Sequence, residues 1–136
     1  GVSYDDGRVF AEFARCVIEK RDIVLHTSGR TIRSYCYTKD AITAIICLLT
    51  RGKTGEAYNV TKTDNAITMA DFAKTVANIA GVDFEFQISE IEVAQKTPIS
   101  KAVLSDEKLK GIGFLPTVSV ASGVKRILDT LREVNK

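Results

Sequence analysis

Residues 31–49 read TIRSYCYTKDAITAIICLL, and this stretch combines the two patterns that decide the fold. Its first half alternates well enough between apolar and polar side chains to predict a strand over residues 32–37. Its second half predicts a helix that Thr38 caps and Gly52 ends. That helix is apolar on nearly every side, so it should be covered on both sides. Arg33 stands at the start of this core-like segment, either as a solvated charge or as part of a binding site.

The composition is that of one ordinary globular domain. The chain has 136 residues, of which 45% are hydrophobic and 26% charged, enough for one core but not for two comfortable domains. A net charge of +2 argues against a nucleic-acid or membrane-surface partner. No window approaches the roughly 20 apolar residues that cross a bilayer. Cys16, Cys36 and Cys47 form no CxxC pair, which favours reduced thiols in a cytoplasmic protein over a disulfide framework.

The rest of the chain predicts a mixed α and β fold from hydrophobic periodicity. Helices are expected over residues 5–20, 67–81, 105–113 and 119–134, and short strands over residues 22–26, 56–60 and 82–88. The strands at 22–26 and 32–37 could form a hairpin, because SGR between them is typical of a turn.

Helix ends and inward faces follow from the same patterns. Thr68 is expected to cap the helix at 67–81 and Gly81 to end it, while Asp5 or Asp6 caps the first helix. The apolar face of the first helix is expected to hold Val9, Phe10, Phe13, Val17 and Ile18, and that of the last helix Val120, Val124, Ile127, Leu128 and Leu131.

Two Tyr-x-x-x-Lys spacings occur, Tyr35 with Lys39 and Tyr58 with Lys62. In short-chain dehydrogenases this spacing is catalytic because both residues lie on one face of a helix, where the ammonium lowers the pKa of the phenol. Both tyrosines here lie in predicted strands, which do not offer that geometry. The sequence therefore predicts that neither pair is catalytic.

Other catalytic and cofactor patterns are incomplete. Gly111 and Gly113 supply two glycines of a GxGxxG loop, but no strand precedes them. A Cys–His nucleophile pair would need His26, the only histidine, and nothing places a cysteine beside it. No His, Cys or carboxylate cluster has metal-ligand spacing. We therefore predict no catalytic residue and no metal site in this chain.

Three cationic residues remain as candidates for binding an anion. Arg33 leads a predicted strand, Arg8 opens the first helix, and Lys101 precedes a short helix. The planar fork of arginine suits a diphosphate held by two hydrogen bonds, and a lysine adds a point charge. Each of these residues taken alone is more often a surface charge, and His26 alone is more often a residue at the edge of a loop.

Four stretches, taken in order, resemble a known family. They are DDGRVFAEF, GRTIRSYCYTKDAITAI, GEAYNV and KLKGIGFLPTVSVASGVKRIL. Together they resemble the C-terminal part of NAD-dependent nucleotide-sugar epimerases and dehydratases, the extended short-chain dehydrogenase family. In the last stretch Phe114 stands in place of the family's tryptophan, and Val120 in place of a leucine.

The resemblance implies roles for the cationic residues. Arg33 matches the family arginine that contacts the diphosphate of the sugar nucleotide, and Arg8 matches an arginine of the nucleotide pocket. His26 falls where many relatives place an aromatic ring that stacks on the base. Lys101 falls where an arginine often makes a further phosphate contact.

The resemblance also implies supporting roles for residues around Arg33. Tyr35 and Tyr37 would support the wall of the pocket, and Asp40 would cap the helix that follows it. The apolar helix and EAYNV would pack against a dinucleotide-binding domain. A chain without that domain should therefore expose apolar surface or self-associate.

By resemblance, residues 1–136 are the nucleotide-sugar-binding C-terminal domain of an extended Rossmann-type dehydrogenase. The glycine-rich NAD loop, the catalytic Ser/Thr and the helical Tyr-x-x-x-Lys of the family would all lie upstream of Gly1, whose place at the start predicts a piece of a longer enzyme. NAD or NADP would be bound mainly by that missing half, and this chain alone would be inactive.

The expected substrate is a UDP-, dTDP-, CDP- or GDP-linked sugar. Which of these is bound, and whether the reaction is epimerisation, dehydration or decarboxylation, stays open. The alternative is a stand-alone, non-catalytic nucleotide-binding or interaction module built on the same domain.

Overall fold

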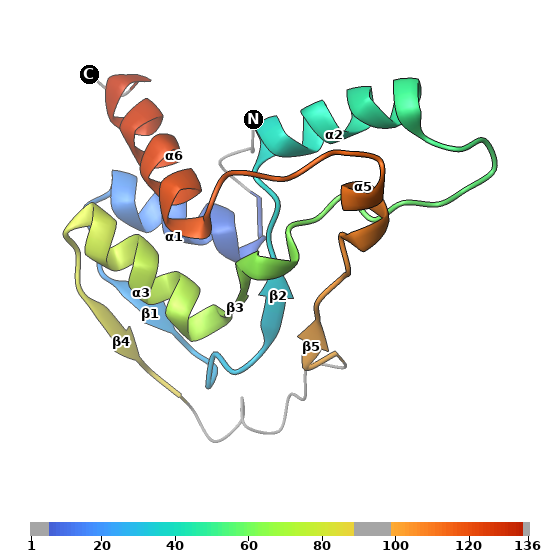
Figure 1. Cartoon of the computed structure of the whole chain (residues 1–136). Helices are drawn as coiled ribbons and strands as arrows, with labels where there is room; N and C mark the ends of the chain where they lie inside the picture. Colours follow the sequence, from blue (N-terminus) through green and yellow to red (C-terminus); the bar gives the residue numbers. More distant parts are fainter. Residues whose placement is uncertain (1–5, 89–98, 135–136) are drawn as a thin grey trace.

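The computed structural model describes residues 6–88 and 99–134. Its helices are α1 (Val9–Ile18), α2 (Thr38–Arg51), α3 (Met69–Ala80), α5 (Glu107–Gly111) and α6 (Val120–Val134), and a 3-10 turn, η1, spans Thr63–Asn65 (Figure 1). Its strands are β1 (Ile23–Leu25), β2 (Ile32–Ser34), β3 (Ala66–Thr68), β4 (Phe84–Phe86) and β5 (Lys101–Ala102). The mixed α and β class is confirmed. The strand expected over residues 56–60 is wrong, since that segment pairs with no strand of the described chain.

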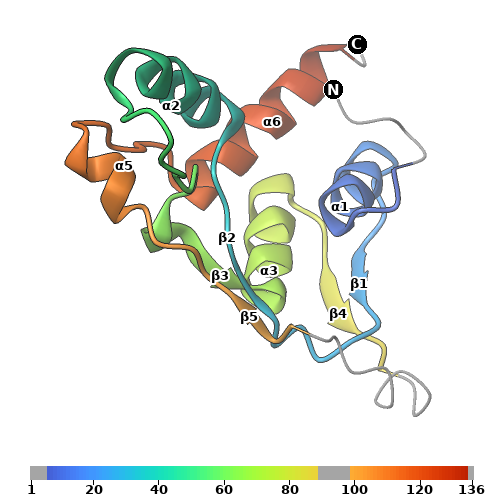
Figure 2. The ribbon, with the colours of Figure 1, turned by 90° about the vertical axis from the view of Figure 1, so that its right-hand side faces the viewer.

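The strands form two small sheets, and α3 lies between them (Figure 2). One sheet pairs β1 with β4 in parallel. The other has β2 at its centre, antiparallel to β3 and parallel to β5. The predicted hairpin between the strands at 22–26 and 32–37 is therefore wrong. The segment between them is bound to the start of α3 instead, because the carbonyls of Gly29 and Thr31 accept hydrogen bonds from the first amides of that helix.

The core lies where α1, α3 and α6 meet β1. Its buried members include Phe13, Cys16, Ile23, Leu25, Phe72, Ala73, Val76, Ala77, Val124 and Leu128. Phe72 is at the centre of an aromatic group, with the rings of Phe10 and Phe13 tilted against it and the ring of Tyr35 stacked on it at 4.7 Å. Val9 and Ile18 were expected inside but are 41% and 38% exposed, because they stand at the two ends of α1, beyond its partners.

Helix ends agree with the sequence where a side chain or a glycine sets them. Thr68 Oγ1 accepts a hydrogen bond from the amide of Asp71, and Gly81 ends α3 with a φ of +76°. Gly52 ends α2 as predicted, but the cap at Thr38 is wrong: α2 begins one residue earlier, after Tyr37, with no side-chain cap.

Helix α2 projects from the body of the molecule (Figure 1). On its inner side Asp40 and Ala44 are buried. Its outer side carries Ile42, Ile45, Ile46 and Leu49, exposed by 54%, 52%, 58% and 82%. The expectation that α2 is covered on both sides is wrong for the described chain, while the expectation of exposed apolar surface is confirmed. The sequence of α2 is apolar on two faces, and the described residues pack against only one of them.

Candidate functional site

Arg33 lies in β2, the central strand of the three-stranded sheet. Its Nη1 donates a hydrogen bond to the carbonyl of Ile32 and its Nη2 donates one to the carbonyl of Ile99, both at 2.9 Å. Among residues 6–88 and 99–134, no carboxylate pairs with this guanidinium. Two carbonyls orient the group without neutralising its charge, and further N–H donors remain to bind an anion.

Lys101 lies in β5, beside β2, but its side chain does not join that of Arg33. In the parallel register Lys101 is opposite Ile32, and Ala102 is opposite Arg33. Because side chains of successive residues alternate between the faces of a strand, Lys101 and Arg33 point to opposite faces. The sequence predicted that both cations are near the site, but it could not give this register.

Arg8 precedes α1 and already has an anionic partner. Its Nη2 lies 2.5 Å from a carboxylate oxygen of Asp6, and its Nε bonds both oxygens of that carboxylate. The hydrogen bonds from Arg8 lower the pKa of Asp6 to about 2, and in turn raise the pKa of Arg8. Asp6 also accepts the backbone amide of Arg8, but the cap predicted at Asp6 is wrong, because Arg8 is the capping residue of the first helix and no side chain caps it. Asp5 lies outside the described residues. A phosphate at Arg8 would have to compete with Asp6.

His26 follows β1 and is exposed. Its Nδ1 lies 3.4 Å from the carbonyl of Gln87, which follows β4. His26 therefore belongs to the β1–β4 sheet, whereas Arg33 belongs to the other sheet (Figure 2). Of the four predicted binding residues, the structure places Arg33 and Lys101 on neighbouring strands, and Arg8 and His26 elsewhere.

An apolar groove opens next to the end of β2. It has a volume of about 230 Å³ and lies between the segment after β2, α1 and the start of α6. Tyr35 and Tyr37 line it, together with Phe10 and Asn65. Burial raises the pKa of Tyr35, whose ring is stacked on Phe72. Tyr35 therefore supports the strand of Arg33 from the core side.

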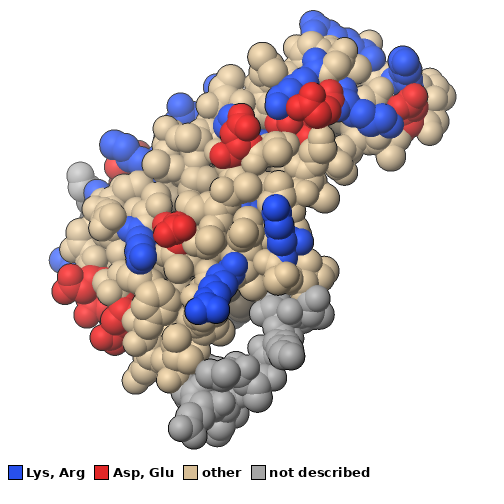
Figure 3. All heavy atoms as spheres, turned by 60° about the horizontal axis from the view of Figure 1, so that its bottom comes forward, with Lys and Arg blue, Asp and Glu red and all other residues tan. Residues whose placement is uncertain are grey.

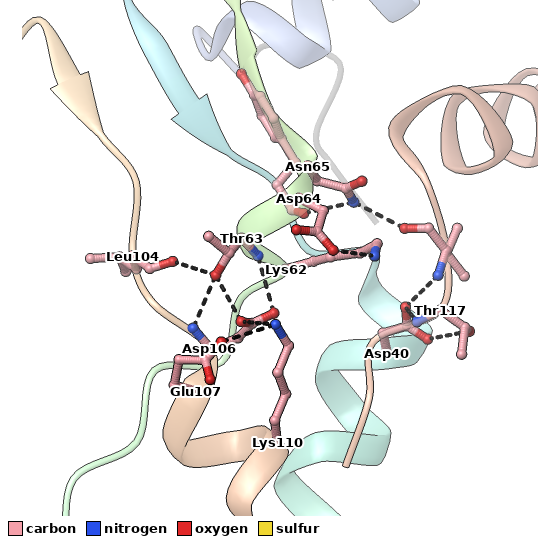
Figure 4. A network of polar contacts seen from close by, with 12 residues as sticks. Asp40, Lys62, Thr63, Asp64, Asn65, Leu104, Asp106, Glu107, Lys110 and Thr117 are labelled. Carbon is pink, nitrogen blue, oxygen red and sulfur yellow. Dashed lines mark hydrogen bonds and ion pairs between the residues drawn. The ribbon is translucent and has the colours of Figure 1, made fainter.

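Asp40 does not cap α2, which corrects the prediction. Its carboxylate accepts hydrogen bonds from the amides of Thr117 and Val118, both at 2.8 Å, and it is only 6% exposed (Figure 4). It therefore fastens the first turn of α2 to the segment before α6. Asn65 acts in parallel, since its side-chain amide donates to the carbonyls of Tyr35 and Val118 at 3.0 and 2.9 Å.

Asp106, which is buried, and Thr63, which is half-buried, form a second network that the sequence did not reveal (Figure 4). The Asp106 carboxylate accepts hydrogen bonds from Thr63 N at 3.2 Å and Thr63 Oγ1 at 2.8 Å, and it pairs with Lys110 Nζ at 2.9 Å. Burial acts to raise the pKa of Asp106, but the hydrogen bonds from Lys110 and Thr63 outweigh it, and the pKa falls to about 2. The only signal available in the sequence was the capping position of Asp106 before a short helix.

The described residues hold no complete catalytic or cofactor apparatus. Tyr35 precedes α2 while Lys39 lies within it, and Tyr58 lies in an irregular segment, so neither Tyr-x-x-x-Lys pair shares a helix. A dinucleotide loop follows a strand and opens a helix, whereas Gly111 ends α5 and Gly113 comes after it, so these glycines do not fit NAD. Within the described ranges no His, Cys, Asp or Glu group could hold a metal ion, and no helix is long and apolar enough to cross a membrane.

Surface charges are mixed on the face seen in Figure 3. Its basic side chains are separated by other residues, and those toward the arm at the upper right intermingle with acidic ones. The described part of this face therefore carries no continuous basic patch of the kind that binds nucleic acid.

Comparison with known proteins gives one family match and several similar proteins. Residues 2–61 match the model of the NAD dependent epimerase/dehydratase family. A trifunctional UDP-glucose 4,6-dehydratase/UDP-4-keto-6-deoxy-D-glucose 3,5-epimerase/UDP-4-keto-L-rhamnose-reductase of Arabidopsis thaliana is 27% identical over 125 residues. The matched region covers 90% of this chain and 18% of the plant protein.

Two solved structures share the fold. UDP-glucose 4-epimerase of Thermotoga maritima, solved with UDP-glucose, superposes with a TM-score of 0.83 at 23% identity. The matched region covers 98% of this chain and 42% of the epimerase chain. RMD of Pseudomonas aeruginosa, solved with NADPH, superposes with a TM-score of 0.82 at 19% identity. The matched region covers 98% of this chain and 45% of the RMD chain.

The chain spans less than half the length of each of these three proteins. Its mixed α/β fold resembles part of the extended short-chain dehydrogenase fold. The family match and the fold together relate this chain to the NAD-dependent epimerases and dehydratases, as a part of their length.

Proposed function

We propose that this chain is the substrate-binding part of an NAD(P)-dependent nucleotide-sugar epimerase, dehydratase or decarboxylase, and that Arg33 binds the diphosphate of the sugar nucleotide. The observation that carries the proposal is the environment of Arg33, whose guanidinium is oriented by two carbonyls and paired with no carboxylate of the described chain. The relatives named above include enzymes that act on or were solved with UDP-glucose.

The nicotinamide cofactor would be bound by another part of the enzyme. Gly111 and Gly113 do not form a dinucleotide loop, and no catalytic Tyr-x-x-x-Lys pair shares a helix among the described residues. We therefore expect the 136-residue chain to bind a nucleotide sugar without converting it, and to show no affinity of its own for NAD or NADP.

The test is the affinity of the chain for UDP-, dTDP-, CDP- and GDP-linked sugars, measured by isothermal titration calorimetry before and after Arg33→Ala. A hydrogen bond to a charged group contributes about 1.5–3 kcal/mol, so Arg33→Ala should weaken binding of the preferred nucleotide sugar by about 10- to 150-fold. The matching nucleoside, which has no phosphate, should show no such loss.

Arg30→Ala is the matched control, because Arg30 is an exposed arginine three residues earlier. Its removal should leave every affinity within about 2-fold, since an isolated surface charge contributes little. Equal losses for Arg30→Ala and Arg33→Ala, or no loss for either, would show that Arg33 does not contact the diphosphate.

A second candidate is a stand-alone module that binds a nucleotide or a protein partner without catalysis. The apolar outer side of α2 favours an interaction role of some kind. Hydride transfer by the full-length protein from a sugar nucleotide to NAD would exclude this candidate, whereas binding without turnover there would favour it.

A further inference from the structure

The strand that carries Arg33 is held between two short neighbours. β2 has three residues, β3 has three and β5 has two. Ladders this short fix a strand only weakly, because each contributes a few hydrogen bonds at most. The position of Arg33 therefore depends on whatever else fixes β3 and β5 relative to each other.

The carbonyl of Ile99 links the position of β5 directly to the guanidinium of Arg33. It accepts the hydrogen bond from Arg33 Nη2, and Ile99 lies just before β5. The next carbonyl, that of Ser100, accepts the amide of Ile32 at 2.9 Å. A shift of β5 along or away from β2 would therefore move an acceptor that orients Arg33.

The contacts between Thr63 and Asp106, named here the Thr63–Asp106 staple, join the two outer strands beyond the end of β2. Thr63 opens η1, which runs directly into β3, and Asp106 follows β5 by four residues. Three hydrogen bonds connect these segments: Thr63 N and Oγ1 donate to the Asp106 carboxylate, and Asp106 N donates to Thr63 Oγ1 at 3.0 Å (Figure 4). The carbonyl of Leu104, 3.1 Å from Thr63 Oγ1, is a second acceptor for the same hydroxyl proton.

The staple is also tied to β2 itself. Ser34 is the last residue of β2. Its hydroxyl lies 3.0 Å from the hydroxyl of Thr61, and its Oγ accepts a hydrogen bond from the backbone amide of Leu104 at 3.4 Å. Asp106 is 1% exposed and Thr61 is 3% exposed, so water has little access to the side chains of these two residues. Both outer strands are thereby clamped to each other and to the end of the strand that carries Arg33.

We propose that Asp106, acting through Thr63, is a positioning residue for Arg33: the staple holds β5, and with it the carbonyl of Ile99, where it orients the guanidinium for an anionic ligand. The ligand part of this inference rests on the proposed function. The orientation of Arg33 does not, and it can be measured without a ligand.

The first experiment measures the {1H}–15N NOE of Arg33 Nε in the labelled chain, with the resonance assigned by its loss in Arg33→Lys. A held guanidinium gives a high value and a mobile one a low value. Asp106→Asn and Thr63→Val should lower it while backbone amides of the core, such as that of Phe72, keep their wild-type values.

Two conservative variants are the matched controls. Glu107→Gln makes the same carboxylate-to-amide change one residue later, on a side chain that is 77% exposed and bonds Lys110. Thr63→Ser keeps the hydroxyl that forms the staple. Both should retain the wild-type NOE of Arg33. Unchanged values in folded Asp106→Asn and Thr63→Val would overturn the inference. Failure of both variants to fold would overturn it too, because the staple would then be a requirement of the fold.

The second experiment adds the preferred nucleotide sugar. Loss of pre-orientation of one side chain should weaken binding about 2- to 10-fold in Asp106→Asn, and this loss should vanish when Arg33→Ala is already present. If the wild-type chain binds no nucleotide sugar, the proposed function fails while the NMR result still decides the staple. If binding needs Arg33 but ignores Asp106, the positioning role alone fails.

Discussion

Arg33 and Arg8 show how the surroundings of one residue type decide what it can do. Arg8 holds the carboxylate of Asp6, and this pair lowers the pKa of Asp6 to about 2. Arg33 has only carbonyl partners in the described chain, so its positive charge is oriented but not balanced. The same contrast separates Asp106, whose hydrogen bonds are directed and buried, from its neighbour Glu107 at the surface.

The depressed pKa of Asp106 predicts a loss of stability in acid. Its folded pKa of about 2 lies below the ordinary value of 3.8, so the folded state binds fewer protons there than the unfolded state. The resulting stabilisation, about 2 kcal/mol, is complete above about pH 5 and is lost as the pH falls toward about 2. The free energy of unfolding in urea should therefore differ more between wild type and Asp106→Asn at pH 6 than at pH 2.5.

Glu107→Gln provides the comparison for that titration. Its difference from wild type should be small at both pH values, because an exposed pair contributes little. A wild-type minus Asp106→Asn difference that stays constant from pH 6 to pH 2.5 would contradict the assignment. Asp6 titrates in the same range but is present in both chains and cancels.

At the scale of the elements, the start of α3 is the point where the chain changes direction. Thr68 caps the helix from β3, and the carbonyls of Gly29 and Thr31 bind its first amides. These contacts draw the segment between β1 and β2 across the end of α3, which places the two strands in different sheets. Gly29 allows this because it combines a φ of +61° with a close approach to Ala70.

Two glycines with positive φ should respond differently to the same substitution. A Cβ at Gly81 would meet nothing within 4 Å, so Gly81→Ala should cost only the strain of a left-handed backbone, about 1–2 kcal/mol. A Cβ at Gly29 would lie 2.7 Å from that of Ala70, so Gly29→Ala should cost about 2–5 kcal/mol. Urea unfolding of both variants measures this difference, and equal costs would mean that the contact with Ala70 relaxes freely.

At the scale of the whole molecule, α3 joins a well-packed body to a partly covered arm. It contacts α1, α6 and strands of both sheets, and its residues fill the centre of the core. Helix α2 stands away from this body, and its first turn is fastened by Asp40 to the segment before α6 (Figure 1). The outer side of α2 carries four apolar residues that the described part of the chain leaves more than half exposed, Ile42, Ile45, Ile46 and Leu49.

This bare face predicts concentration-dependent self-association of the isolated chain. Ile45 and Leu49 are 52% and 82% exposed, and removing such surface from water favours association by about 25 cal/mol per Å². Ile45→Lys combined with Leu49→Lys should shift the chain toward monomer in sedimentation-velocity runs. Leu115→Lys alters an apolar residue that is 63% exposed but off the helix, and it should leave the association unchanged. A wild-type chain that is monomeric at all concentrations would contradict the prediction.

Local patterns in the sequence were enough for the helices. The periodicity of residues 67–81, the hydroxyl of Thr68 and the glycine at position 81 all act within one helix, and they predicted α3 with its cap and its end. The strands were harder to predict, because a strand of three residues alternates too briefly to be told from irregular chain. Residues 56–60 were predicted as a strand and are irregular, whereas β3 was not predicted. Arg33 could be singled out from the charge it brings to a core-like segment.

By itself, then, the sequence determined the mixed α and β class, the helices and the cationic candidates, since propensity, periodicity and charge are properties of neighbouring residues. Only the tertiary structure decided that Arg33 and Lys101 face opposite ways, that Asp40 fastens α2 from the side, and that Thr63 meets Asp106. Those outcomes join segments about 40 to 80 residues apart, and they depend on how two sheets pack around α3 rather than on any local pattern.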